Sequence, residues 1–229
     1  MGLMLYFTPE LFRFLSQLKK NNDREWFAAN KVRYESSVRD PFSRFIADFA
    51  PPLQKISRHF IADPNPARGS MMRIYRDIRF SKDKSPYKTA VAAHFWHEKG
   101  KEGATPAFYL HLEPGKSMIG AGIWRPEPKT AKKIRDAIVK DSDQWKKATT
   151  VREFRTAFKM GGESLKRPPQ GYEGNHPCIV DIKRKDFVVG SALRDSEVCS
   201  TNFLETLMKR LRILAPYTKF LTEAVGLPF

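Results

Sequence analysis

The residues of this chain that are best suited to chemistry lie in one short segment, residues 71–88. The segment holds six basic residues, two aspartates and two tyrosines. Arginine and lysine at this density favour an anionic ligand, because guanidinium groups form paired hydrogen bonds with phosphate or carboxylate. We therefore predict an anion-binding surface here, made by eight residues: Arg73, Tyr75, Arg76, Arg79, Lys82, Lys84, Tyr87 and Lys88.

Polar and apolar residues alternate along 71–79, interrupted at Arg76, and this pattern is typical of a β-strand. A regular strand would place four polar side chains on one face: Arg73, Tyr75, Asp77 and Arg79. Asp77 would be held ionised by its basic neighbours and would orient them. Residues 81–88 follow as a polar turn. The composition is also typical of an edge strand and loop that carry charge against aggregation, and that alternative stays open.

Histidine and aromatic residues in the next segments share the parity of this strand. One face of a sheet would then gather six side chains: Arg73, Tyr75, His94, Trp96, Tyr109 and His111. Gly120 and Gly122 have the same parity as Trp124, and glycine lets a ligand or another backbone approach closely. The pattern predicts a concave site in which Trp96, Tyr109 and Trp124 stack on a ligand. In the alternative, these residues simply close a sheet face against helices.

Such a site supports three hypotheses of function. The first is a binding or regulatory protein that holds a phosphate-bearing ligand, nucleic acid being one such ligand. The second is an enzyme acting on a phosphorylated or otherwise anionic small molecule, in which Asp77 or His111 serves as the acid or base. The third is an interaction protein with a charged surface and no ligand. The cofactor, the substrate and the oligomeric state are left undetermined by the sequence.

Familiar cofactor and metal motifs are absent from the sequence. It has no Walker A loop, no G-x-G-x-x-G fingerprint and no H-E-x-x-H. His94 and His97 would face opposite sides of a strand, and Cys178 and Cys199 lack the C-x-x-C spacing of zinc sites. We therefore expect no metal site.

The net charge of +16 favours polyanions such as nucleic acid, phosphorylated ligands or acidic membrane surfaces. The excess is concentrated in residues 71–88 and in residues 129–169, where twelve basic residues stand against five acidic ones. A generally basic, solvated surface is the alternative. No window offers the roughly 20 apolar residues of a transmembrane helix. The two cysteines read as reduced thiols, so the cytoplasm is the expected compartment.

The order of helical and strand patterns along the sequence predicts the elements that position these residues. They form an α+β fold with N-terminal helices, a central antiparallel sheet of about four or more strands, and C-terminal helices. Thr8-Pro9 begins the first helix and Asn21-Asn22 ends it. Helical spacing continues towards Phe60, with Pro51-Pro52 breaking or kinking the last helix. No repeat or linker divides the chain, so residues 1–229 are expected to form a single α+β domain.

Strands are predicted in six ranges: 71–79, 91–97, 106–113, 117–124, 154–160 and 186–193. Hairpin turns are expected at 98–105 and 113–117 because both contain glycine. Further helices are predicted in four ranges: 126–140, 142–149, 201–214 and 217–225. An extended loop is expected at 161–176.

At these residues the sequence resembles a known family, the DUF2461 family of uncharacterised proteins. The resemblance is carried by Asn21-Asn22-Asp23-Arg24-Glu25-Trp26-Phe27, by the run from Arg73 to Lys88, and by Gly120-Ala121-Gly122. It extends from Phe7 to about Leu221. The resemblance implies one domain of that family and no catalytic assignment, because the function of the family is unknown.

Overall fold

At the centre of the computed structural model, which describes residues 4–100 and 105–229, lies a five-stranded antiparallel sheet. The strands stand in the order β1-β2-β3-β5-β4. Their bounds are β1 (Val91–Trp96), β2 (Ala107–Leu112), β3 (Met118–Ile123), β4 (Lys159–Met160) and β5 (Phe187–Ala192). The four longer strands begin and end within one residue of the predicted bounds. The hairpin turn expected at 98–105 falls partly outside the described residues.

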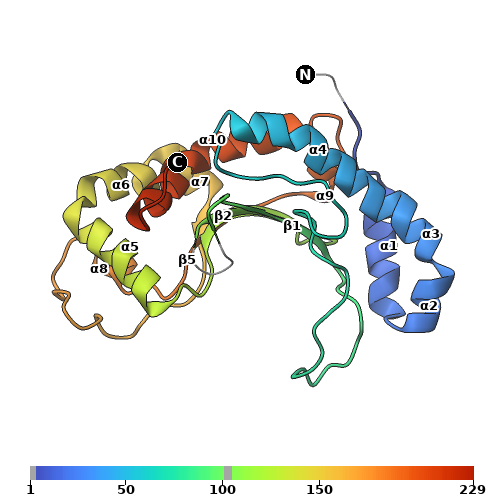
Figure 1. Cartoon of the computed structure of the whole chain (residues 1–229), viewed down its shortest axis with the longest axis horizontal. Helices are drawn as coiled ribbons and strands as arrows, with labels where there is room; N and C mark the ends of the chain where they lie inside the picture. Colours follow the sequence, from blue (N-terminus) through green and yellow to red (C-terminus); the bar gives the residue numbers. More distant parts are fainter. Residues whose placement is uncertain (1–3, 101–104) are drawn as a thin grey trace.

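Helices precede and follow this sheet, which confirms the predicted α+β fold (Figure 1). Before it come α1 (Pro9–Lys20), α2 (Arg24–Ala29), α3 (Lys31–Tyr34), the π-helical turn η1 (Glu35–Arg39) and α4 (Asp40–Gln54). Between β3 and β5 come α5 (Pro128–Lys140), α6 (Ser142–Thr150), α7 (Arg152–Ala157) and α8 (Ile179–Ile182). After β5 the chain ends with α9 (Asp195–Val198) and α10 (Phe203–Ala224).

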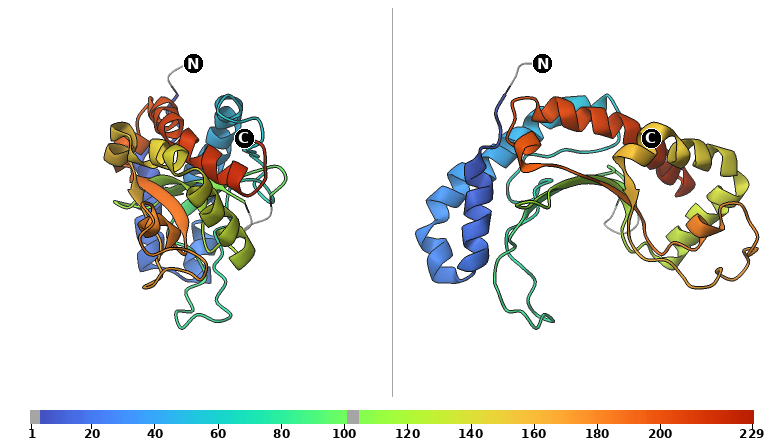
Figure 2. Two further views of the ribbon diagram at one scale, coloured as in Figure 1. Left: turned by 90° about the vertical axis from the view of Figure 1, so that its left-hand side faces the viewer. Right: turned by 180° about the vertical axis from the view of Figure 1, so that it is seen from behind.

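Helices α4 and α10 cover one face of the sheet and leave the other face open (Figures 1 and 2). The covered face is apolar: Phe95 of β1 packs on Phe49 of α4 with ring centroids 4.6 Å apart. Phe45 of α4 meets Phe203 of α10 at 5.4 Å, so the two helices also contact each other. Each buried aromatic ring stabilises the fold by about 1.5–3 kcal/mol. The open face therefore lies between two flanks, with α1–α3 on one side and α5–α8 on the other.

The break predicted at Pro216 is wrong, and at Pro51-Pro52, where a break or a kink was expected, the helix is not interrupted. Helix α10 runs unbroken through Pro216, although the sequence predicts separate helices at 201–214 and 217–225. An internal proline costs about 3 kcal/mol, but Leu214 and Tyr217 on either side of it are fully buried, and such burial contributes a similar amount for each side chain. Pro51 and Pro52 likewise lie within α4, whose last residue is Gln54.

The strand predicted at 154–160 is also wrong over most of its length. Residues 152–157 form α7, and only Lys159–Met160 pair with β5 as β4. Phe154 and Phe158 pack together with ring centroids 5.6 Å apart. Their separation of four residues in the sequence is that of side chains one turn apart on a helix. Short apolar segments fit a helix or a strand equally well by pattern alone.

Residues 73–88 form a long projection, which we call the arm, and they do not form the regular strand predicted over 71–79 (Figure 1). Two isolated bridges, Met71 with Ala93 and Tyr75 with Tyr87, replace a continuous ladder. The cause is local. Asp77 accepts a hydrogen bond from the backbone N–H two residues on, and Asp83 does the same. Such turns compete with the extended backbone of a strand.

The arm is fastened to the corner between α1 and α2. The side-chain amide of Asn22 donates to the carbonyl of Tyr87 at 2.9 Å and accepts from its N–H at 3.0 Å. The ring of Tyr87 stacks on Phe27 at 4.1 Å. Asp23 caps α2 by accepting from the N–H of Trp26 at 2.8 Å, which holds this corner in place. The run Asn22-Asp23 thus serves as the anchor of the arm.

We expect Asn22→Ala to lower the free energy of unfolding by about 1–3 kcal/mol, because it leaves both backbone groups of a buried residue without partners. Urea unfolding and hydrogen exchange at the amides of Tyr87 and Lys88 would measure the loss. Asn21→Ala is the matched control, because its exposed side chain bonds only the carbonyl of Gln17, and we expect about 0.5 kcal/mol or less. Equal effects of the two substitutions would contradict the anchoring role.

Candidate functional site

The open face of the sheet forms a cavity of about 810 Å³, which we call the cradle. The strand register places His94 opposite Tyr109, Tyr109 opposite Gly120, and Gly120 opposite Gly190. These residues therefore share one face, as their alternation predicts for the first three. Trp124, at the end of β3, lies at the cradle and is 57% exposed.

The floor of the cradle is bare backbone because β5 comes very close to β3. A Cβ atom on Gly120 would lie 2.4 Å from the carbonyl oxygen of Val189. A Cβ on Gly122 would lie 1.9 Å from the carbonyl oxygen of Phe187, and its φ of +129° is one that other residues rarely adopt. The glycines are thus required by packing, and they also let a flat group lie directly on the sheet.

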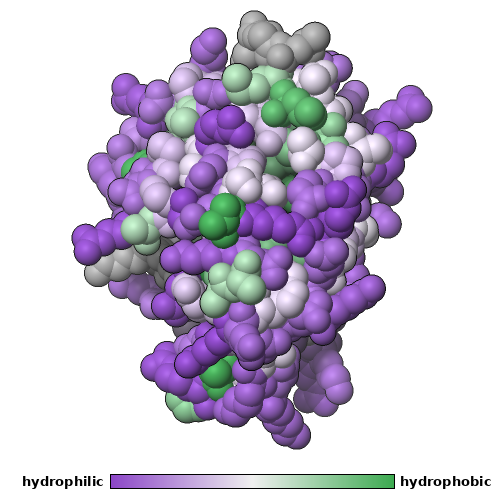
Figure 3. Space-filling model, turned by 90° about the vertical axis from the view of Figure 1, so that its right-hand side faces the viewer, coloured by the Kyte–Doolittle hydropathy of each residue, from purple (hydrophilic) through white to green (hydrophobic). Residues whose placement is uncertain are grey.

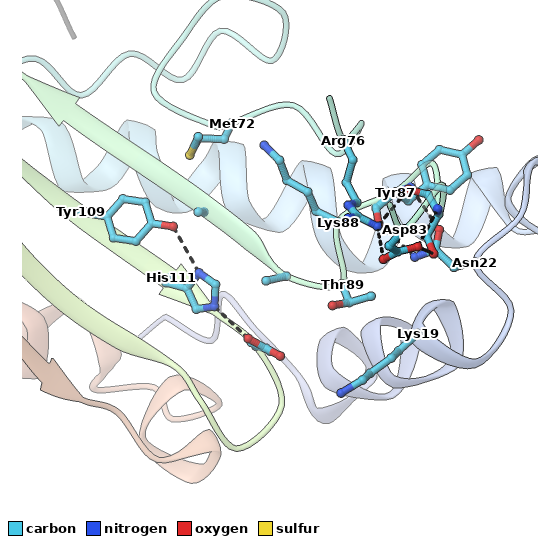
Figure 4. Close-up of a pocket in the computed structure, with 14 residues that line it drawn as sticks. Lys19, Asn22, Met72, Arg76, Asp83, Tyr87, Lys88, Thr89, Tyr109 and His111 are labelled. Carbon is cyan, nitrogen blue, oxygen red and sulfur yellow. Dashed lines mark hydrogen bonds and ion pairs between the residues drawn. The ribbon is translucent and has the colours of Figure 1, made fainter. Parts of the chain in front are cut away.

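A second cavity of about 500 Å³, which we call the polar pocket, opens beside the cradle. Both cavities are lined by Met72 and Tyr109, so they adjoin. The polar pocket lies between the end of β2, the last turn of α1 and the base of the arm (Figure 4). Lys19 comes from α1, and Lys88 comes from the arm. Figure 4 shows the Lys88 side chain extending toward Met72 and the Lys19 side chain on the opposite side of the pocket.

A chain of hydrogen bonds runs along one wall of the polar pocket. His111 Nε2 lies 3.1 Å from Glu113 Oε2, and His111 Nδ1 lies 3.2 Å from the hydroxyl of Tyr109. An ionised carboxylate only accepts, so Nε2 carries the proton that bonds Glu113. In the neutral imidazole Nδ1 is then an acceptor and Tyr109 donates to it. Burial raises the pKa of Tyr109, so its hydroxyl keeps its proton at neutral pH.

The basic residues predicted to bind an anion separate into two groups. Arg76, Tyr87 and Lys88 line the polar pocket. Arg76 is held there by Asp83 and donates to the backbone carbonyl of Ser85 at 3.2 Å. Five basic residues line the two cavities together, against two acidic ones, Asp83 and Glu113. The five are Lys19, Arg76, Lys88, Lys116 and Lys159.

The remaining predicted residues of the segment lie on the arm away from both cavities. Arg73 is exposed, and Tyr75 packs its ring against Tyr87 at 5.4 Å. At the tip of the arm, by which we mean residues 77–84, Arg79 forms an ion pair with Asp77 at 2.6 Å. Asp77 lines neither cavity and so does not lie beside His111 in the wall of the polar pocket. The exposed residues Lys82 and Lys84 also lie near the tip. Arg73, Tyr75, Asp77 and Arg79 therefore do not share a sheet face with the histidines.

Two predicted aromatic residues have different surroundings. Trp96 has the correct parity, opposite Ala107, but it does not line either cavity. Trp124 lines the cradle, and the guanidinium of Arg125 lies 5.9 Å from its ring centroid. Tyr109 is the aromatic residue common to both cavities. The ring platform of the cradle is thus made by Tyr109 and Trp124.

The sequence did not predict several residues that line the two cavities. Glu113 has the parity of His111 two positions earlier, so alternation alone could have identified it. Lys159 lies within the strand predicted at 154–160, of which only Lys159–Met160 pair with β5. Lys19 lies on α1, and nothing in the sequence indicates that this helix ends beside β2. Lys116 lies in a hairpin turn, where a lysine is ordinary.

The described histidines and carboxylates do not form a metal-binding cluster. In the described part of the chain, no three His, Cys, Asp or Glu side chains gather as a metal site would require. His94 lines the cradle, whereas His97 is buried on the other side and its Nε2 donates to the carbonyl of Pro228 at 2.9 Å. Cys178 and Cys199 are free thiols. Within residues 4–100 and 105–229, no helix is both long and apolar enough to cross a bilayer.

Comparison with known proteins gives one match. A family described as a conserved hypothetical protein, DUF2461, matches residues 10–220. No curated protein and no solved structure matches this chain. The match covers α1 through most of α10 and so includes the cradle, the polar pocket and the arm.

We expect the two aspartates of the arm to titrate at about pH 2. Hydrogen bonds from Arg79 lower the pKa of Asp77 to about 2, and bonds from Ser85 and then Arg76 lower that of Asp83 to about 2. Because both values are depressed from 3.8, their contribution to arm order is complete above about pH 4 and is lost as pH falls through 2.

Side-chain carbonyl NMR titration would measure both midpoints. In Arg79→Ala the midpoint of Asp77 should rise towards 3.8 while that of Asp83 stays near 2, so each carboxyl serves as the control for the other. Midpoints near 3.8 for both groups in the unmodified protein would show that these ion pairs do not form in solution.

Proposed function

This chain belongs to the DUF2461 family, and, because the description of that family states no activity, we propose from the geometry that the protein binds a phosphate-bearing ligand with a planar ring. The ring lies in the cradle and the phosphate lies in the polar pocket. A nucleotide, free or within a nucleic acid, has this chemistry.

The main support for the proposal is that two cavities of different chemistry, the cradle and the polar pocket, adjoin at Tyr109. The cradle offers bare backbone at Gly120 and Gly122 and an aromatic side chain at Trp124, which suit a flat ring. The polar pocket offers the ammonium groups of Lys19 and Lys88, which suit phosphate oxygens. Both volumes lie in the range of about 300–1,000 Å³ that is usual for small-ligand sites.

The charge around the site supports an anion. Basic residues exceed acidic ones among the side chains that line the two cavities, and one of the two acidic residues, Asp83, is already paired with Arg76. The net charge of +16 adds a long-range attraction for anions. Lysine contacts of this kind give an affinity that falls as salt rises.

We expect nucleotides to raise the melting temperature more than inorganic phosphate does, because only nucleotides occupy both cavities. A ligand at 100 times its Kd stabilises the fold by about 2.7 kcal/mol. Lys19→Ala should weaken nucleotide binding by about ten-fold or more, through the loss of one charge-assisted contact. Lys20→Ala is the matched control, because Lys20 is exposed and does not line the pocket.

Isothermal calorimetry on the two variants would give the Kd ratio directly. Equal nucleotide affinities of Lys19→Ala and Lys20→Ala would show that the phosphate does not bind in the polar pocket. If a panel of nucleotides and sugar phosphates produced no stabilisation at all, the proposal would be wrong.

The hydrogen-bond chain favours a second candidate function, an enzyme that acts on such a ligand. In this reaction a water molecule gives its proton to the oxygen of Tyr109 while Tyr109 gives its own proton to His111 Nδ1, and the oxygen of that water attacks the phosphorus of the ester. The resulting imidazolium is stabilised by Glu113. The bond from phosphorus to the ester oxygen breaks, and the leaving alcohol takes the proton back from His111. The second hypothesis thus keeps His111 as the acid–base group and replaces Asp77, which is paired with Arg79 on the arm.

If the protein is an enzyme, Tyr109→Phe and His111→Gln should each lower kcat by about 100-fold or more while ligand binding persists. A panel of phosphate mono- and diesters, assayed for released phosphate or alcohol, would identify the substrate. His59→Gln is the matched control, because His59 bonds Glu98 at 2.6 Å without lining either cavity. Tight ligand binding without turnover of any ester would identify a binding protein.

A further inference from the structure

The tip of the arm presents an apolar ring to solvent, and neither cavity accounts for it. The arm extends beyond the body of the molecule (Figures 1 and 2). Phe80 is 94% exposed, and it lies in the turn between the bridged residues Tyr75 and Tyr87. An aromatic ring is stabilised by about 1.5–3 kcal/mol when a partner buries it. A ring held at the end of a projection is placed to meet a partner.

The tip is ordered by its own contacts. Asp77 holds the guanidinium of Arg79, whose central carbon lies 5.8 Å from the centroid of the Phe80 ring. The ammonium group of Lys84 donates to the carbonyl of Ile78 at 3.0 Å, which closes the turn from the other side. Nearer the body, Asp83 joins Arg76 and Ser85. Phe80 therefore lies on a turn that is held in place by these side-chain contacts.

The charge of the arm selects an anionic partner. Its two carboxylates are neutralised within the arm, by Arg79 and by Arg76. Six basic residues stand against these two in residues 71–88, so the arm keeps a net positive charge. Exposed Lys82 follows Phe80 by two positions.

The chemistry around the ring favours nucleic acid over a membrane. Membrane-binding segments bury a continuous apolar face, whereas the neighbours of Phe80 are Arg79, Ser81 and Lys82. The side of the molecule that carries α1–α3 is mostly hydrophilic, with apolar side chains in separate spots (Figure 3). Proteins that bend duplexes, by contrast, insert single apolar side chains between base steps and place arginine and lysine on phosphates.

We propose that the arm binds double-stranded nucleic acid, with Phe80 inserted as a wedge between base pairs and with Lys82 on an adjoining phosphate. This surface is separate from the cradle and the polar pocket, and the inference does not depend on the ligand proposed for them. The wedge kinks the duplex, because it unstacks one base step.

The test is fluorescence anisotropy with a 20-base-pair duplex, as DNA and as RNA, over a series of salt concentrations. Phe80→Ala should weaken binding by about ten-fold or more with an unchanged slope of log K against log salt, because the ring carries no charge. Lys82→Ala should reduce that slope by about 0.9, the contribution of one phosphate contact. Energy transfer between dyes at the duplex ends should report a bend that Phe80→Ala abolishes.

Val32→Ala is the matched control, because Val32 is an apolar side chain that is 78% exposed on α3, away from the arm. Equal duplex binding by Phe80→Ala and Val32→Ala would overturn the proposal. Tighter binding of single strands than of duplexes would also overturn it. So would a loss of binding to vesicles with anionic lipid in Phe80→Ala while duplex binding stays intact. Duplex binding that is sensitive to Lys19→Ala and insensitive to Phe80→Ala would place nucleic acid in the polar pocket and reject the arm.

Discussion

Burial of one face of the sheet by α4 and α10 is the interaction on which the rest of the structure depends. The rings of Phe49 and Phe95 bring helix and sheet together, and Phe45 and Phe203 join the two helices over the same face. Since both long helices lie on one side, no helix of the described residues covers the opposite face, and α1–α3 and α5–α8 lie beside it. A sheet covered on one side exposes its other face, and polar and aromatic residues lie on that face here.

The close approach of β3 and β5 gives this open face its character. Gly120 and Gly122 are required because the carbonyl oxygens of the neighbouring strand occupy the place of a side chain. Packing alone thus demands glycine at these two positions. It also explains why the cradle has a flat floor between Tyr109 and Trp124.

The arm follows a different principle, because its order comes from side chains and only isolated bridges join its two halves. Asp77 and Asp83 form local turns and neutralise arginines, and Asn22 and Phe27 hold the base of the arm. Basic residues at the base face the polar pocket, whereas those near the tip lie beside Phe80. One charged segment of the sequence therefore serves two surfaces.

The sequence by itself determined the α+β class, the four longer strands and the parity that joins His94, Tyr109 and Gly120 on one face, because these depend on periodicity along a single element. It could not determine that Arg73 and Asp77 leave the sheet, since side-chain turns at the aspartates outweigh strand alternation. It could not bring Lys19 and His111 to the same pocket, because α1 and β2 are distant in the chain and only tertiary packing places both at one cavity. Nor could it join 201–214 to 217–225, because burial on both sides of Pro216 outweighs the local cost of proline. Local pattern thus decided the elements, and long-range packing decided which of their residues meet.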